Sequence, residues 1–182
     1  MSILNEKDCI LIVIDIQEKL LKAVYNKHIL EKKAVIMAKT ATMLSIPTIV
    51  TEQYPVGLGS TVDSVLLALP AGTSYFEKSS FSVLEVPEIV EILRTSRKHQ
   101  VILFGIETHI CVSQTANALV EAGYDVTVIA DACGCRDEAV HRAGIERLKE
   151  NGAHIVTTEM ALFELLKTAK HPAFKEIQQM IK

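Results

Sequence analysis

The stretch Cys9-Ile-Leu-Ile-Val-Ile-Asp15 decides the fold of this chain. Six apolar residues follow one another and end in an acid, without the apolar–polar alternation of a strand that has one face in water. A run of this kind is typical of a strand covered on both faces, as in a parallel sheet. The stretch therefore predicts a buried strand with Asp15 at its carboxyl end.

Similar runs recur along the chain, with helical patterns between them. Apolar runs occupy residues 47–51, 101–105, 125–130 and 154–157, and a weaker one occupies residues 74–77. Helical spacing is expected for residues 28–45, 62–69, 88–97, 112–120, 140–148, 160–169 and 174–181. This strand–helix alternation predicts an α/β fold with a mainly parallel sheet.

Composition narrows the class of protein. The 182 residues, of which 49% are hydrophobic and 23% charged, fit one globular domain over residues 1–182. A formal net charge of −3 argues against a nucleic-acid or anionic-membrane partner. The longest apolar run is far shorter than the roughly 20 residues of a membrane span, and the first residues lack signal-peptide features. Four cysteines without secreted-framework spacing favour reduced thiols and a cytoplasmic location, with an organelle as an open alternative.

Three chemically different residues are expected at strand ends, where open parallel sheets bind ligands. Asp15 ends the first strand, Lys78 follows the weak third run, and Cys111 follows the fourth and opens a helix. A helix N-terminus and a nearby lysine would lower the pKa of the thiol, and a carboxylate could accept its proton. Each residue also has a plain structural alternative: a small buried hydrophobe for Cys111, a helix cap for Asp15, and a solvated charge for Lys78.

The sequence does not show the residue spacing of a standard zinc site or the glycine motifs of a nucleotide-binding site. Cys133-Gly-Cys135 and His141 are metal-ligating residue types, but their spacing matches no standard zinc pattern and His141 falls inside a predicted helix. The chain carries neither GxGxxG nor GxxxxGK. We therefore expect no metal site and no cofactor.

Three segments carry a resemblance to the isochorismatase-like cysteine hydrolases. They are Ile12-Val-Ile-Asp15-Ile-Gln17, Glu77-Lys78-Ser-Ser-Phe-Ser82 and Gly105-Ile-Glu-Thr-His-Ile-Cys111-Val. The last is the most specific, because a small loop followed by T-x-x-C-V resembles the nucleophile segment of that family. Residues 50–59 and the tail from His171 look like the subgroup of isochorismatase domain-containing proteins.

The resemblance implies a three-layer fold with a six-stranded parallel sheet in the order 3-2-1-4-5-6 and helices on both faces. It places Asp15, Lys78 and Cys111 on the catalytic triad of the family. It also implies a cis peptide between residues 106 and 107 that turns the amides of Glu107 and Cys111 toward one point, as an oxyanion hole. Candidates for the substrate pocket, each of which could equally serve packing, are Gln17, Tyr54, Phe81 and His109.

Two departures from the family narrow the expected substrate. The nicotinamidase branch has an Asp-x-His metal motif after its second strand, where this chain reads Thr51-Glu-Gln-Tyr54. True isochorismatases lack the nucleophilic cysteine, which is present here as Cys111. We therefore expect a cysteine hydrolase that cleaves a small amide or related C–N bond through a thioester, without a metal, and that assembles as a homo-oligomer. The alternatives are a non-catalytic binding or scaffold protein that retains the pocket, and a redox-reactive thiol protein.

Overall fold

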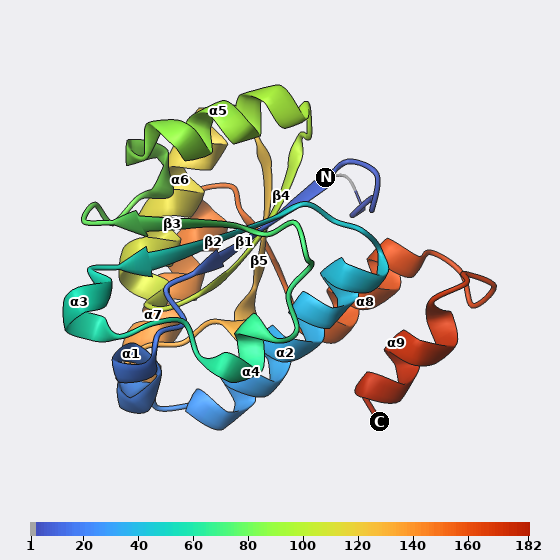
Figure 1. Ribbon diagram of the computed structural model, residues 1–182, viewed down its shortest axis with the longest axis horizontal. Coiled ribbons are helices and arrows are strands. Elements are labelled where there is room, and N and C mark those ends of the chain that lie inside the picture. Colours follow the sequence, from blue (N-terminus) through green and yellow to red (C-terminus); the bar gives the residue numbers. More distant parts are fainter. Residues whose placement is uncertain (1–2) are drawn as a thin grey trace.

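Six parallel strands form the centre of a computed structural model that describes residues 3–182 (Figure 1). The strands are β1 (Cys9–Ile14), β2 (Thr48–Gln53), β3 (Ser74–Lys78), β4 (Gln100–Gly105), β5 (Asp125–Ile129) and β6 (His154–Val156). Their order in the sheet is β3-β2-β1-β4-β5-β6, and every neighbouring pair is parallel. The predicted parallel sheet and its strand order are thus confirmed.

Helices cover both faces of this sheet. They are α1 (Glu18–Ala23), α2 (Lys27–Met43), α3 (Pro55–Leu58), α4 (Asp63–Leu66), α5 (Pro87–Ser96), α6 (Ser113–Glu121), α7 (Glu138–Glu150), α8 (Thr158–Leu166) and α9 (Phe174–Met180). Helices α2 and α8 pack together on one face and α6 and α7 on the other (Figure 1). Within residues 3–182, no helix combines the length and the apolar character needed to cross a membrane.

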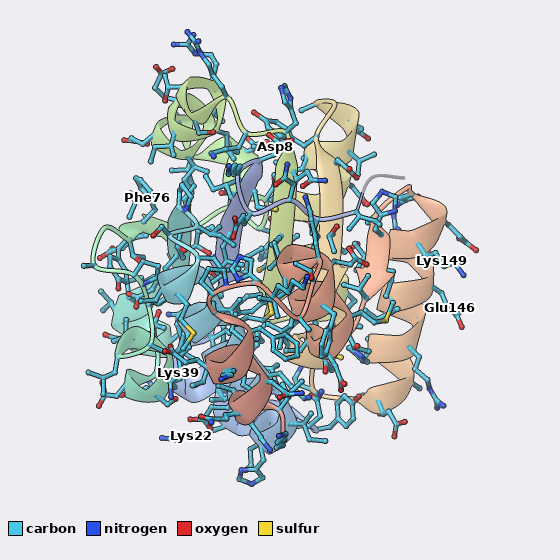
Figure 2. All side chains as sticks on the ribbon, turned by 90° about the vertical axis from the view of Figure 1, so that its right-hand side faces the viewer. Asp8, Lys22, Lys39, Phe76, Glu146 and Lys149 are labelled. Carbon is cyan, nitrogen blue, oxygen red and sulfur yellow. The ribbon has the colours of Figure 1, made fainter. Side chains whose placement is uncertain are left out.

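Burial follows the position of each strand in the sheet. All residues of β1 and β4, the two central strands, are buried. Strand β3 lies at an edge and alternates between half-buried and exposed residues until Lys78. An edge strand has neighbours on one side only, which explains why its sequence carried a weak apolar signal. On the outer layer, the charged side chains of Glu146 and Lys149 on α7 point away from the fold (Figure 2).

Short helices occupy the long segment between β2 and β3. The sequence predicted one helical turn there, at residues 62–69, and α4 confirms it over a shorter range. Helix α3 was not predicted; it begins at Pro55, whose fixed φ suits the first helical position. Helix α1 was also missed, because six residues are too few to show a helical period. These short elements crowd the carboxyl ends of β1 and β2.

The ends of β1 and β4 approach each other closely at the point where the strand order reverses. Asp15 leaves β1 in the left-handed region with φ 51°, a conformation that Asp tolerates better than most residues. Gly105 ends β4 with φ 141°, and a Cβ atom there would overlap the backbone carbonyl of Ile14. Glycine is therefore required at position 105.

The substitution Gly105→Ala is expected to lower the free energy of unfolding by at least about 2 kcal/mol, because it combines an unfavourable φ with a backbone clash. Urea unfolding followed by circular dichroism measures the effect. Gly72→Ala is the matched control, since a Cβ there meets nothing within 4 Å, and it should change stability by no more than about 0.5 kcal/mol. Equal losses for the two variants would contradict the close approach.

Candidate active site

A buried ion pair joins the ends of the first and third strands. Nζ of Lys78 lies 2.7 Å from Oδ2 of Asp15, and both side chains are fully buried. Strand β2 separates β1 from β3, and all three strands end at the same edge of the sheet. The expectation that strand-end residues from distant parts of the chain meet at this edge is therefore met for Asp15 and Lys78.

Further hydrogen bonds fix both charges in place. The hydroxyl of Thr51 donates to Oδ1 of Asp15 at 2.7 Å, so each carboxylate oxygen has its own donor. Nζ of Lys78 also donates to Oε1 of Gln53 at 2.7 Å and to the carbonyl of Ser80 at 3.3 Å. A buried ion pair is tolerated only when such partners replace the lost water. Neither charge is therefore free to rotate toward solvent.

Cys111 lies beside this pair on the turn that follows β4. The turn is a π-helix, Thr108–Val112, that leads directly into α6, and π-helical turns are frequent at functional sites. The Asp15 carboxylate, the Lys78 ammonium and the backbone N–H of Glu107 are the groups near enough to Cys111 to shift the pKa of its thiol. The peptide bond between Ile106 and Glu107 is cis. One carboxylate, one ammonium, one thiol and a backbone amide are thus neighbours at this edge of the sheet.

The electrostatics of Cys111 correct the expectation from its position in the sequence. Burial, and secondly the charge of Asp15, raise the pKa of the Cys111 thiol to about 12, and these effects outweigh the opposite influence of Lys78 and of the Glu107 amide. The sequence suggested a lowered pKa because Cys111 was placed at a helix start. The π-helical turn begins at Thr108, however, so Cys111 lies inside it. The resting thiol is therefore protonated, with the Asp15 carboxylate as a close neighbour.

The four residues predicted for the substrate pocket differ in burial and in their contacts. Gln17 is fully buried, and its amide donates to the carbonyls of Gln53 and Gly59 while accepting from the Gln53 N–H. It ties the end of β2 to the loop at Gly59, and its predicted contact with a substrate stays a prediction. Tyr54 and Phe81 lie just beyond the ends of β2 and β3 and are 62% and 49% exposed, and their contact with a substrate stays a prediction. His109 is half-buried and approaches Glu107 and Cys135.

Thr51 and Gln53 are site residues that the sequence reasoning missed. In the register of β2, Thr51 pairs with Ile14 next to Asp15, and Gln53 pairs with Lys78. Both residues were noted only for the absence of a histidine in their segment. The signal that could have found them is the strand register itself, because side chains at the carboxyl end of β2 must lie between those of β1 and β3.

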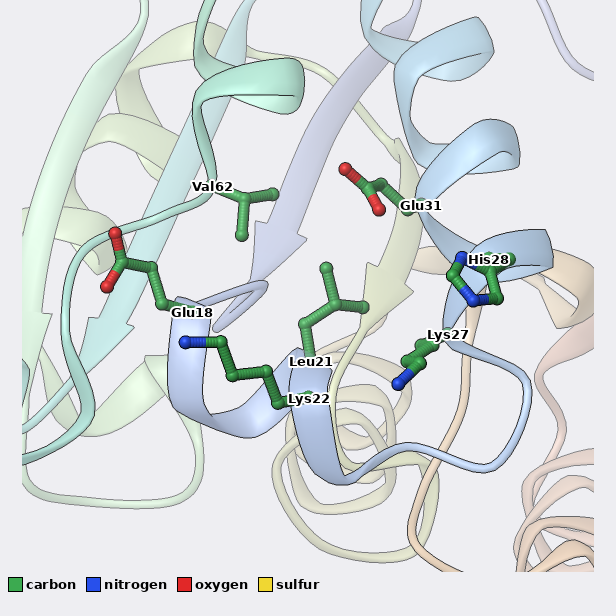
Figure 3. A pocket seen from close by; sticks show the side chains of 7 residues that line it. All are labelled: Glu18, Leu21, Lys22, Lys27, His28, Glu31 and Val62. Carbon is green, nitrogen blue, oxygen red and sulfur yellow. The ribbon is translucent and has the colours of Figure 1, made fainter.

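A separate groove of about 390 Å³ lies between α1, α2 and the start of α4 (Figure 3). The side chains that line it include charges of both signs and the apolar groups of Leu21 and Val62. The full lining is Glu18, Leu21, Lys22, Lys27, His28, Glu31 and Val62. Asp15, Lys78 and Cys111 do not line it, so it is distinct from the candidate active site.

Comparison with known proteins identifies the family of the chain. The model of the isochorismatase domain matches residues 9–160, and the chain therefore belongs to the isochorismatase-like hydrolase family. Isochorismatase domain-containing protein 2 of Xenopus laevis is 38% identical over 98% of this chain and 85% of its own length. The structure of MAR1 ribonuclease from Caenorhabditis elegans is 36% identical with a TM-score of 0.95, and covers 99% of this chain and 92% of its own. The YcaC gene product of Escherichia coli, an octameric hydrolase of unknown specificity, shares the fold at 22% identity with a TM-score of 0.89, over 100% and 97% of the two chains.

Substitutions of the two charged residues should move Cys111 reactivity in opposite directions. Asp15→Asn removes a charge that raises the thiol pKa, so alkylation at a given alkaline pH should become faster, by about tenfold for each pKa unit. Lys78→Met removes a charge that lowers this pKa, so alkylation should become slower. The rate of iodoacetamide labelling of the Cys111 peptide between pH 7 and pH 10, followed by mass spectrometry, measures both effects.

The matched control for Lys78→Met is Lys33→Met, because Lys33 makes a partly exposed ion pair with Asp131 that involves none of the site residues. Its labelling curve should superimpose on that of the wild type. Identical curves for the wild type, Asp15→Asn and Lys78→Met would show that the three side chains are not electrostatically coupled.

Proposed function

We propose that this protein is a cysteine hydrolase that cleaves a small amide, or a related bond between a carbonyl carbon and nitrogen, through a thioester on Cys111. The observation that carries the proposal is a buried Asp15 carboxylate, held by Lys78 at 2.7 Å, that lies close enough to the Cys111 thiol to shift its pKa. A nucleophile whose base is oriented by a third group is the general signature of covalent catalysis. Asp15, Lys78 and Cys111 are the proposed catalytic residues.

The first half of the reaction forms the thioester. Asp15 accepts the thiol proton while Sγ of Cys111 attacks the carbonyl carbon of the substrate. Negative charge develops on the carbonyl oxygen, and the backbone N–H groups of Glu107 and Cys111 are the proposed oxyanion hole. Because the thiol pKa is raised to about 12, the thiolate forms during the attack and not before it. Lys78 keeps Asp15 positioned and stabilises the charge as it moves.

The second half returns the enzyme to its resting state. Asp15 gives the acquired proton to the substrate nitrogen as the C–N bond breaks, and the amine leaves. A water molecule then transfers a proton to Asp15 and attacks the thioester carbonyl. The tetrahedral intermediate collapses, the carboxylic acid leaves, and Sγ of Cys111 regains its proton from Asp15. One carboxylate acts as base and acid in turn, which requires a fixed position between thiol and leaving group.

We propose that neither a metal nor a cofactor takes part in this reaction. The residues named above supply a nucleophile, a proton carrier and charge stabilisation. Residues 51–54, where the nicotinamidase branch has its metal motif, hold no histidine. The Glu52 carboxylate in this segment accepts a hydrogen bond of 2.6 Å from the Thr61 N–H, so it serves the loop.

Cleavage of RNA is a second candidate, because the solved structure that is 36% identical to this chain bears the name of a ribonuclease. The site favours the amide. A phosphodiester is anionic and needs uncompensated cations at the reacting group, whereas Lys78 is neutralised by Asp15. The formal net charge of −3 gives no general attraction for a polyanion either. The proposed substrate is therefore a small molecule.

We also propose that the chain assembles as a homo-oligomer, in line with the family resemblance. Several large apolar side chains on the segments after β2 and β3 face solvent, among them Tyr54, Val56, Leu67 and Phe81, and Val56 and Leu67 are nearly 90% exposed. Covering such residues is a common use of a subunit interface. Sedimentation at micromolar concentration should give at least twice the 20.1 kDa of one chain, and a monomer at that concentration would contradict this proposal.

Loss of Cys111 should abolish hydrolysis. Wild type, Cys111→Ala and Cys9→Ser are compared on a panel of small primary and secondary amides and a short single-stranded RNA, after treatment with a chelator. Cys111→Ala should lose at least about a thousandfold in kcat/KM, as expected for the removal of a nucleophile. Cys9→Ser is the matched control, because Cys9 is also buried but lies at the end of β1 that is remote from Asp15.

Three results would contradict the proposal in distinguishable ways. Hydrolysis that survives in Cys111→Ala would remove the nucleophile, and cleavage of RNA in place of amides would favour the second candidate. Binding of amides without turnover by the wild type would favour a binding protein that retains the pocket.

A further inference from the structure

Two loops at the carboxyl ends of β4 and β5 bring a second set of reactive side chains together. Residues Glu107 and His109 belong to the turn after β4, and Cys135 follows β5 and its short 3₁₀ turn. One ligand atom from each of these three side chains lies within 4.8 Å of the other two. None of the three side chains takes a chemical step in the proposed reaction, although His109 is also a candidate for its substrate pocket.

Backbone contacts hold the two loops in register. Ile106 and Gly134 form a parallel β-bridge, and the Thr108 N–H donates to the carbonyl of Gly134 at 3.0 Å. The Gly134 N–H in turn approaches the carbonyl of Gly105 at 3.4 Å. The three side chains therefore project from a rigid frame and not from independent loop tips.

The hydrogen bonding of this cluster is incomplete. Nδ1 of His109 is buried and finds no hydrogen-bond partner within residues 3–182. The Glu107 side chain is only 13% exposed, yet it pairs with Arg136, whose side chain is 67% exposed, at 3.2 Å. Cys135 is fully buried, and its thiol donates to the Asp137 carbonyl. A buried polar atom without a partner is uncommon and points to a group that completes the cluster.

We propose that Glu107, His109 and Cys135 form a binding site for a thiophilic divalent cation, with Zn²⁺ as the type. A carboxylate, an imidazole and a thiolate are the donors that zinc accepts, whereas Ca²⁺ and Mg²⁺ require oxygen ligands. Three protein ligands leave a fourth tetrahedral position for water or another small ligand.

Binding requires only a small contraction of the cluster. Zinc bonds of about 2.0–2.3 Å bring donor atoms closer together than their present separation. Glu107 reaches the ion by leaving Arg136, and an ion pair with so exposed a partner is weak. Cys135 exchanges its hydrogen bond to Asp137 for the metal and releases its proton to solvent.

Of the three residues of this cluster, only Cys135 was considered as a metal ligand from the sequence. Cys133 and His141, whose spacing with Cys135 matches no zinc pattern, lie outside the cluster, and Nδ1 of His141 lies 2.8 Å from the Thr108 hydroxyl. The loop pairing brings Cys135 to His109 instead. Since the Glu107 amide faces the Cys111 sulfur, an ion on the Glu107 carboxylate would restrain the turn that carries the nucleophile. The ion takes no step in hydrolysis, so its binding can be tested even if the hydrolase proposal fails.

The test is a titration of the untagged, reduced, chelator-treated protein with Zn²⁺ and, for spectroscopy, with Co²⁺. One ion should bind per chain, and Co²⁺ should give tetrahedral visible bands with a thiolate-to-metal charge-transfer band in the near ultraviolet. Cys135→Ser should remove the charge-transfer band. His109→Asn and Glu107→Gln should each weaken Zn²⁺ binding by at least about tenfold, since even the loss of an indirect partner costs that much.

Matched controls separate this cluster from other thiols. Cys133→Ser, the same substitution two residues away, should retain both the charge-transfer band and the affinity. His109→Asn keeps the test valid should Cys135→Ser fail to fold, because His109 is only half-buried. Absence of stoichiometric binding by the wild type would overturn the proposal. So would a charge-transfer band that persists in Cys135→Ser and disappears in Cys111→Ser, because the ion would then occupy the proposed nucleophile.

Discussion

The buried ion pair between Asp15 and Lys78 is the interaction on which the site depends. It lies where water is excluded from both side chains, and its partners Thr51 and Gln53 come from the strand between them. Removing one member of such a pair leaves an uncompensated buried charge, typically at a cost of about 3–5 kcal/mol. The pair therefore joins the ends of three strands and holds a carboxylate against the Cys111 thiol, so one contact serves both the fold and the proposed chemistry.

The raised pKa of Cys111 distinguishes the hydrolase proposal from the redox alternative. Redox-reactive cysteines combine a low pKa with solvent access. Cys111 has neither property, since it is 6% exposed and its pKa is raised to about 12 by burial and by Asp15. A thiol with a raised pKa reacts slowly with general oxidants, and in the proposed mechanism it becomes nucleophilic only when its proton passes to Asp15. The arrangement favours attack on a bound carbonyl over oxidation by agents in solution.

Features encoded within one segment were predictable from the sequence, and features that depend on contacts between segments were not. The apolar run at residues 9–14 predicted a strand covered on both faces. The alternation of strands and helices predicted a parallel sheet, and the carboxyl ends of its strands place Asp15, Lys78 and Cys111 at one edge. The buried role of Gln17 could not be seen, because its partners are backbone atoms of a loop whose path the sequence does not reveal. The thiol pKa was predicted in the wrong direction, because burial and a carboxylate in hydrogen-bond contact are properties of the assembled site.

The mass of the intact protein, after rapid acid quenching during turnover of an amide substrate, shows directly whether Cys111 forms a thioester. We expect the wild type to gain the mass of the acyl group, with the adduct on the Cys111 peptide, and Cys111→Ala to gain none. A thioester formed by Cys111 and hydrolysed by water predicts that this adduct appears before the carboxylic acid is released and decays at the rate of its release. Continued turnover with no adduct on Cys111 at any quench time would contradict the account.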